Sequence, residues 1–196
     1  MAHLSYKTKA FVLGSLPRGE ANRVFILLTP DLGLIYAHGQ GVRLEKSKLR
    51  FSLDDYSLVE VMLVHGKTGW RITNASSELS VSMHVDKKTL KIIARATSLV
   101  RKLVVGEDAN YHLYTIWDET MKILTEKNHT ETELSRIEIV WVLKILFSLG
   151  YIDGEKLQNI ISSPIEMIGE SSEVDDLRSE AISQINRAIE SSQLFF

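Results

Sequence analysis

The chain has 196 residues, of which 44% are apolar and 24% are charged, and its formal net charge is −2 at pH 7. This composition is typical of a globular protein with one large domain or two small ones, and it excludes a chain that is basic throughout. Because no cysteine occurs, disulfides and thiolate metal sites are excluded as well. No apolar run reaches the roughly 18 residues of a membrane span, so we expect a cytoplasmic protein.

The charge is distributed unevenly along the chain. Residues 1–78 carry a net charge of +3 and residues 79–196 a net charge of −5. A mildly basic first part followed by an acidic second part is consistent with a binding domain joined to a scaffold.

Short apolar runs separated by glycine-rich turns occupy the first 78 residues. In one of these runs Ala37, Gly39 and Gly41 share a face, which suits the inner side of a strongly bent barrel strand. Residues 15–19 are interpreted as the turn after the first strand. The pattern predicts a five-stranded OB-type barrel, although an SH3-like barrel fits the same periodicity. The expected strands are 10–13, 24–28, 33–41, 58–64 and 70–73.

After about residue 80 the apolar spacing becomes helical. Thr130 and Glu133 have the spacing of a capping box, and Gly150 is the expected end of the following helix. The sequence therefore predicts two domains, an OB-fold domain at 1–78 and an all-α helical bundle at 79–196. The expected helices are 85–105, 109–125, 134–149, 155–161 and 172–192, with an irregular linker at 164–169 and an apolar tail at 194–196 that docks on the bundle.

No arrangement of residues in the sequence predicts catalysis. A complete phosphate loop, a nucleophile elbow and a full dinucleotide fingerprint are all missing. Asp54 and Asp55 are adjacent, so their side chains point to opposite faces of an extended chain and suit a turn better than an acid–base pair. The six histidines lack the spacing of metal ligands. We therefore expect a protein that is not an enzyme and needs no cofactor or metal.

The densest positive charge follows the expected third strand. Arg43, Lys46, Lys48 and Arg50 lie within eight residues and are opposed only by Glu45. Four like charges so close together repel one another, which favours a polyanion as their partner. The alternative is a solvated turn between strands.

Further candidates for nucleic-acid binding surround this loop. OB barrels bind oligonucleotides across the face of strands two and three and its flanking loops. Arg18 and Arg23 belong to that region, where the alternative is ordinary surface charge. Tyr36 and Phe51 are aromatic residues that can stack on bases, and the alternative for both is the barrel core.

A second set of cations is predicted on one face of the first helix. Placed on a helical wheel, the basic residues fall opposite the apolar side. They predict an extension of the phosphate path or a docking surface for an acidic partner, and the alternative is a solvated helix face. We call Lys88, Lys91, Arg95 and Lys102 the α-helical stripe.

Several motifs follow one another in the first 80 residues. They are KTKAFVL from Lys7, GEANRV from Gly19, LLTPDLGL from Leu27, GQGVR from Gly39, KSKLR from Lys46 and the apolar run from Leu53 to Val61. In this order they resemble the RecO family of bacterial recombination mediators. Phe147-Ser-Leu-Gly-Tyr151 resembles the point where many members pass into a zinc knuckle, but no cysteine follows in this chain.

The resemblance implies a non-enzymatic mediator of DNA repair and recombination. It implies binding of single- and double-stranded DNA, annealing of complementary strands, and a cytoplasmic, nucleoid-associated protein. The implied partners are RecR, the acidic C-terminal tail of single-strand-binding protein and, indirectly, RecA, and no membrane. The stripe is the expected site for that tail. The alternative is an adaptor whose barrel and helices bind other proteins rather than DNA.

Overall fold

The computed structural model describes residues 4–168 and 173–192. The chain divides into two compact units. The first runs to His84 and also includes Val105–Tyr114, and the second comprises Val85–Val104 and the chain from Thr115 onward. A domain boundary at residue 78 stays a prediction.

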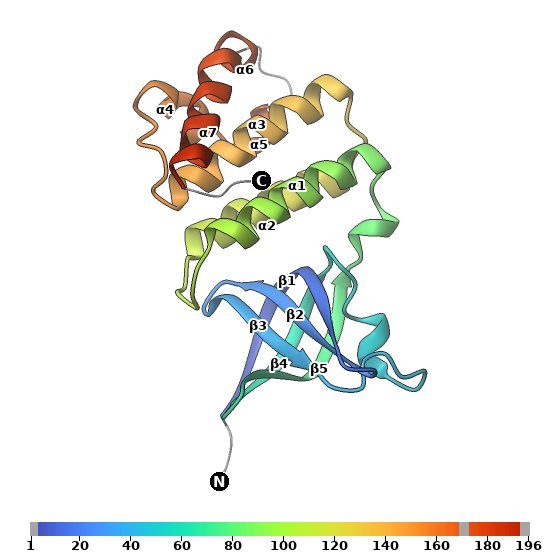
Figure 1. The fold of residues 1–196 in the computed structure, drawn as a ribbon. Coiled ribbons are helices and arrows are strands. Elements are labelled where there is room, and N and C mark those ends of the chain that lie inside the picture. Colours follow the sequence, from blue (N-terminus) through green and yellow to red (C-terminus); the bar gives the residue numbers. More distant parts are fainter. Residues whose placement is uncertain (1–3, 169–172, 193–196) are drawn as a thin grey trace. The chain divides into compact units, whose positions relative to one another are not determined.

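The first unit contains a closed five-stranded barrel (Figure 1). Its strand order is β1-β2-β3-β5-β4, with β1 pairing to β4 to close the ring. β3 and β5 run parallel, whereas the other neighbours are antiparallel. The expected OB-type barrel is confirmed. The strands are β1 (Ser5–Arg18), β2 (Asn22–Thr29), β3 (Gly33–Gly39), β4 (Leu58–Gly66) and β5 (Gly69–Leu79).

Small residues on β3 allow the barrel to close around its core, as the sequence predicted for two of three positions. Ala37 and Gly39 are buried. A Cβ on Gly39 would lie 2.6 Å from Val42 Cγ2 and 2.7 Å from Phe25 Cε2, so no larger side chain fits there. Gly41 was wrongly placed in this strand: it lies in the turn after β3, with a φ of 65°.

The prediction that β1 ends at Gly14 was wrong. The strand continues to Arg18, and Ser15 pairs with Phe25 of β2. The pairing register shifts between Val12 and Gly14, and Gly14 has a φ of 138°. Such a β-bulge bends a strand without ending it, which explains why a glycine that resembled a turn signal lies inside the longest strand of the barrel.

The segment after the first helix returns to the barrel. Trp70 Nε1 donates to Glu107 Oε2 at 2.9 Å, and the rings of Phe11 and Tyr114 lie 5.6 Å apart. Gly33 packs so closely on this segment that a Cβ would lie 2.2 Å from the Asp108 carbonyl oxygen. Residues 105–114 therefore belong to the barrel unit, although the sequence pattern assigned them to the helical part.

The second unit is helical, as expected. α3 supplies much of its core, and the ring centroids of Trp117 and Trp141 lie 4.7 Å apart in it. Thr130 and Glu133 form the predicted capping box, and Gly150 follows α3 with a φ of 76°. The α-helices are α1 (Lys87–Leu103), α2 (Tyr111–Glu126), α3 (Glu131–Ser148), α4 (Gln158–Ser162), α5 (Ile165–Ile168), α6 (Glu173–Asp176) and α7 (Arg178–Ser191), with a 3₁₀ turn η3 (Glu155–Leu157). The 3₁₀ turns η1 (Lys48–Phe51) and η2 (Val81–Met83) and the first turn of α2 belong to the first unit.

Two details of the helical part differ from the predictions. The expected linker at 164–169 contains α5, because Ile165 and Ile168 are both buried one helical turn apart. The expected last helix is divided into α6 and α7. The tail expected at 194–196 lies outside the described residues.

Candidate nucleic-acid interface

The cations expected to bind nucleic acid lie on the loop between β3 and β4, which we call the cationic loop (residues 40–57). Val42 and Leu53 belong to the buried core of the barrel, and Leu49 packs against that core. These apolar residues hold the loop on the barrel, so the basic side chains between them point into solvent. The exposed cations are Arg43, Lys46, Lys48 and Arg50.

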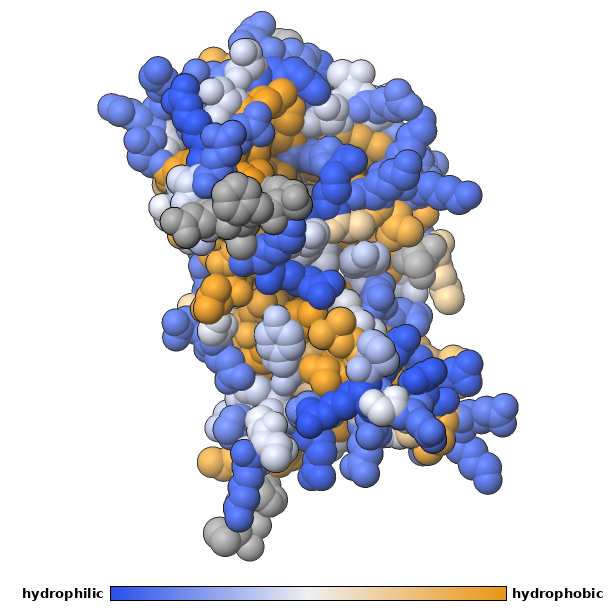
Figure 2. Space-filling model, viewed as in Figure 1, coloured by the Kyte–Doolittle hydropathy of each residue, from blue (hydrophilic) through white to orange (hydrophobic). Residues whose placement is uncertain are grey.

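Two hydrogen bonds tie the beginning of the cationic loop to the β1–β2 turn. The Arg43 amide donates to the Ala21 carbonyl at 3.0 Å, and the Gly41 amide donates to Asn22 Oδ1 at 2.8 Å. In Figure 1 the loop and this turn lie at the same end of the barrel. Figure 2 shows hydrophilic side chains projecting from this end, at the lower right of the view. Arg18 and Arg23, which flank the turn, are exposed.

None of these cations pairs with a carboxylate within residues 4–168 and 173–192. The contrast lies on the same barrel, where Lys7 Nζ is 3.0 Å from Glu60 Oε1 and Lys9 Nζ is 2.8 Å from Glu78 Oε2. The cations of the loop are therefore not held in ion pairs within these residues, which leaves them available to an external anion.

Both candidate stacking residues are accessible rather than part of the barrel core. Tyr36 is 48% exposed on β3, and Phe51 is 74% exposed at the end of η1. The Arg50 guanidinium carbon lies 5.8 Å from the centre of the Phe51 ring. Leu44 is also exposed on this loop. A cationic loop with an exposed aromatic ring has the two components of single-strand binding, phosphate contacts and a stacking surface.

Between β3, β5 and the β1–β2 turn lies a pocket of about 200 Å³ that we call the β3 pocket. His38 and Arg71 are paired neighbours in the parallel register of β3 and β5. The pKa of His38 is lowered, first by burial and then by the nearby Arg18, while a hydrogen bond to the Thr68 backbone acts in the opposite direction. The lining residues are Arg18, Asn22, His38, Gly39, Gln40, Thr68 and Arg71.

Of the lining residues, only Arg18 was predicted from the sequence as a site residue. Arg71 lies between Trp70 and Ile72, which are both buried, so the alternation predicted that its side chain points outward. Its place beside His38, however, depends on the parallel pairing of β3 with β5, which are separated in the sequence by the cationic loop and β4. No local sequence pattern predicts such a pairing.

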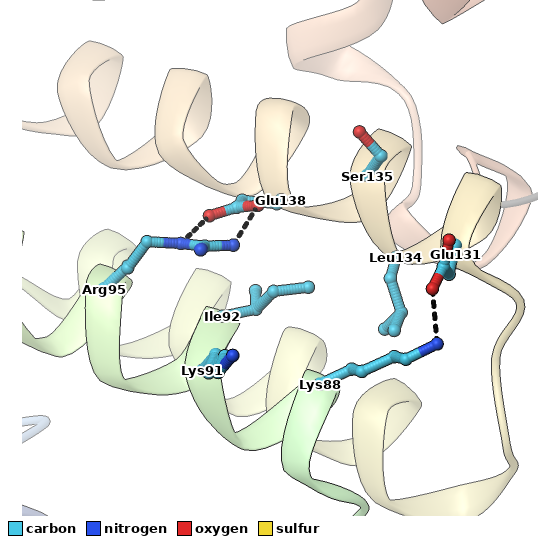
Figure 3. A pocket seen from close by; sticks show the side chains of 8 residues that line it. All are labelled: Lys88, Lys91, Ile92, Arg95, Glu131, Leu134, Ser135 and Glu138. Carbon is cyan, nitrogen blue, oxygen red and sulfur yellow. Dashed lines mark hydrogen bonds and ion pairs between the residues drawn. The ribbon is translucent and has the colours of Figure 1, made fainter.

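The α-helical stripe lies in a different electrostatic setting, and Figure 3 shows three of its cations, Lys88, Lys91 and Arg95. Arg95 donates two hydrogen bonds to Glu138 of α3, from Nε at 2.6 Å and from Nη2 at 2.7 Å. Lys88 forms an ion pair with Glu131, and Lys91 lies between the two pairs (Figure 3). These carboxylates reduce the charge available to an acidic partner. Docking of an acidic tail on this stripe stays a prediction.

Within residues 4–168 and 173–192, no helix combines the length and apolarity needed to cross a membrane. Within the same residues, no three potential metal ligands among His, Asp and Glu lie together.

The fold defines the chain as an OB-barrel protein with a helical second unit. No protein-family model matches it. It is 33% identical over 147 residues to a DNA repair protein RecO of Dehalococcoides mccartyi strain CBDB1, a match that covers 74% of this chain and 56% of that relative. A RecO of strain 195 is 40% identical over 132 residues, covering 66% of this chain and 51% of the relative. The chain belongs to the RecO family.

A more distant relative has similar coverage. DNA repair protein RecO of Alkaliphilus metalliredigens is 25% identical over 141 residues, which is 71% of this chain and 56% of that protein. The chain thus spans about half the length of the curated relatives it matches.

Proposed function

We propose that this protein binds the phosphate backbone of DNA through the barrel and acts in DNA repair as a mediator without catalytic activity. The observation that carries the proposal is the cationic loop. Its exposed cations have no carboxylate partner among the described residues, and they lie on an OB barrel beside the turn that flanks the usual oligonucleotide-binding face. The names of the relatives support a role in DNA repair.

Single-stranded and double-stranded DNA are both proposed ligands. Phosphate contacts do not depend on base sequence, and they exist in either form of DNA. Tyr36 and Phe51 add stacking surfaces that only unpaired bases can use. A protein that holds two complementary strands in this way raises their local concentration, which supports annealing as part of the same proposal.

The proposed protein partners are supported only by membership of the RecO family. RecR, the C-terminal tail of single-strand-binding protein and, indirectly, RecA are the proposed partners in loading the recombinase. For the tail, the α-helical stripe is the proposed surface. Binding there has to compete with Glu131 and Glu138, which already engage two of its cations.

Salt dependence provides the test of DNA binding. Fluorescence anisotropy with labelled single-stranded, duplex and forked DNA, each at several salt concentrations, should give affinities that fall steeply and linearly in log–log form. A weak salt dependence, or no binding to any of the three, contradicts the proposal. An adaptor that binds proteins through the exposed Leu44 and Phe51 of the loop would instead give salt-insensitive binding to a protein partner.

A further inference from the structure

The β3 pocket has the composition of a site for one phosphate group. Its polar lining includes two guanidinium groups, from Arg18 and Arg71, and the hydroxyl of Thr68. Asn22 contributes an amide whose oxygen already accepts from the Gly41 amide, so its NH₂ group remains as a donor with a fixed orientation. Donors from three strands and one turn therefore surround one small space.

The charges that face His38 are all positive. β1 contributes Arg18 and β5 contributes Arg71, while β2 contributes only the uncharged Asn22. Lys67 lies in the adjoining β4–β5 turn, next to Thr68. No carboxylate is among the described residues that line the pocket. An anion entering it thus meets unneutralised positive charge together with a titratable ring.

The contact between Arg18 and His38 favours one protonation state of the imidazole ring. Arg18 Nη1 lies 2.9 Å from Nδ1 and 2.8 Å from Nε2 of His38. A guanidinium group only donates hydrogen bonds, so one of the two ring nitrogens has to accept from Arg18, and that nitrogen is unprotonated. This agrees with the lowered pKa of His38, which favours the neutral imidazole.

We propose that the β3 pocket binds a backbone phosphate of DNA and that His38 takes up a proton when it does so. The phosphate draws the Arg18 guanidinium to itself, which frees the ring nitrogen that had accepted from it. A neighbouring anion favours the charged imidazolium, which then donates a hydrogen bond to a phosphate oxygen. The inference rests on the proposed function, because it assigns the site one class of ligand, the phosphodiester.

The coupling has a definite sign. Bound phosphate raises the pKa of His38 above its value in the free protein, so binding consumes a proton at any pH between the two values. DNA affinity therefore increases as pH falls through this window, by at most about tenfold per pH unit for one proton. Above the window both states are neutral and the dependence disappears.

The experiment uses a labelled oligothymidylate, since thymine and the phosphodiester do not titrate between pH 6 and 8. Affinity is measured by anisotropy across this range at constant ionic strength for the wild type, His38→Gln and the matched control His112→Gln. His112 is exposed on α2 and does not line the pocket. We expect affinity that rises several-fold toward pH 6 in the wild type and the control, and a flat profile in His38→Gln.

A direct titration of the His38 ring by NMR makes the test independent of the variant. Spectra of the wild-type protein are recorded alone, with the oligothymidylate and with sulfate, an anion that has no proton to exchange. A raised His38 pKa with the oligonucleotide supports the proposal. If the oligonucleotide binds but the His38 pKa is unchanged, the proton-linked site is refuted and the proposed function stands. If the oligonucleotide does not bind, both proposals fail, whether or not sulfate raises the pKa.

Discussion

Two sets of four cations, equally prominent in the sequence, differ in how they are held. Those of the cationic loop are positioned by apolar residues of the loop that reach the barrel core, and they have no carboxylate partner among the described residues. In the α-helical stripe, Arg95 and Lys88 are instead engaged by carboxylates of α3. The positive charge of the loop is available to a ligand, whereas much of that of the stripe is used within the protein.

The difference shows that a count of basic residues does not measure the charge that a surface presents. An exposed ion pair contributes little stability, yet it cancels most of the field that would attract a polyanion. Loop cations without partners contribute almost nothing to stability and leave that field intact. Mutation of the loop cations should therefore change DNA affinity more than stability, and mutation of the paired stripe cations should change stability more than DNA affinity.

The largest effect is expected from removing an apolar anchor of the cationic loop. Leu53→Ala should lower the free energy of unfolding by about 2–4 kcal/mol, because Leu53 is 3% exposed and its truncation leaves a cavity in the barrel core. DNA affinity should fall with it, although no charge is removed. Urea denaturation and anisotropy measure the two effects. The control is Leu44→Ala on the same loop, which is exposed and should change stability by less than about 0.5 kcal/mol.

Acid should weaken the helical unit before the barrel. Each carboxyl group with a lowered pKa in the described residues belongs to the helical unit, and hydrogen bonds to the carboxylate are the first cause in each case. Because the folded pKa lies below the unfolded one, the stabilisation is present above the unfolded pKa and is lost as pH falls through the folded pKa. These groups are Asp86, Glu131, Glu133 and Asp175.

Tryptophan fluorescence separates the two units in this acid titration. Trp117 and Trp141 lie in the helical core, whereas Trp70 lies in the barrel. In a Trp70→Phe variant the denaturation midpoint reported by the helical pair should decrease between pH 6 and pH 3. Asp175→Asn should make this decrease smaller, since Arg136 hydrogen bonds lower the pKa of Asp175. An equal decrease with and without that carboxylate contradicts the assignment.

The smallest effects come from single cations, and they should separate cleanly. Arg95→Ala breaks the pair with Glu138 and should cost about 0.2–1 kcal/mol of stability, with no change in DNA affinity. Arg43→Ala should leave stability unchanged within about 0.5 kcal/mol and weaken DNA binding. Thermal denaturation and anisotropy on the two variants provide the comparison. If Arg95→Ala lost DNA affinity while Arg43→Ala kept it, the assignment of the phosphate contacts to the cationic loop would be contradicted.

Local patterns in the sequence were sufficient for the fold class and for the cationic loop. Alternating burial defines β4 and the start of β5, and the capping box at Thr130 marks the start of α3. The end of β1 was missed, because a glycine in a bulge resembles a glycine in a turn. The return of residues 105–114 to the barrel was missed since it rests on contacts such as that of Trp70 with Glu107.

The parts of the site that escaped prediction depend on distant pairings. His38 and Arg71 become neighbours only through the parallel β3–β5 register. Likewise, Arg95 and Glu138 are 43 residues apart in the sequence, so the residues around Arg95 do not predict its ion pair. Residue type and spacing identified the cations, but the partners that neutralise them became visible only in three dimensions.

The central claim is that the cationic loop, and not the stripe, supplies the phosphate contacts. Two quadruple alanine variants test it, one at Arg43, Lys46, Lys48 and Arg50 and the other at Lys88, Lys91, Arg95 and Lys102. The slope of log affinity against log salt for single-stranded DNA should decrease by about 3 in the loop variant, at roughly 0.7 per lost phosphate contact. It should be unchanged in the stripe variant. A folded loop variant with the wild-type slope, or a stripe variant with a slope reduced as much, would contradict the account.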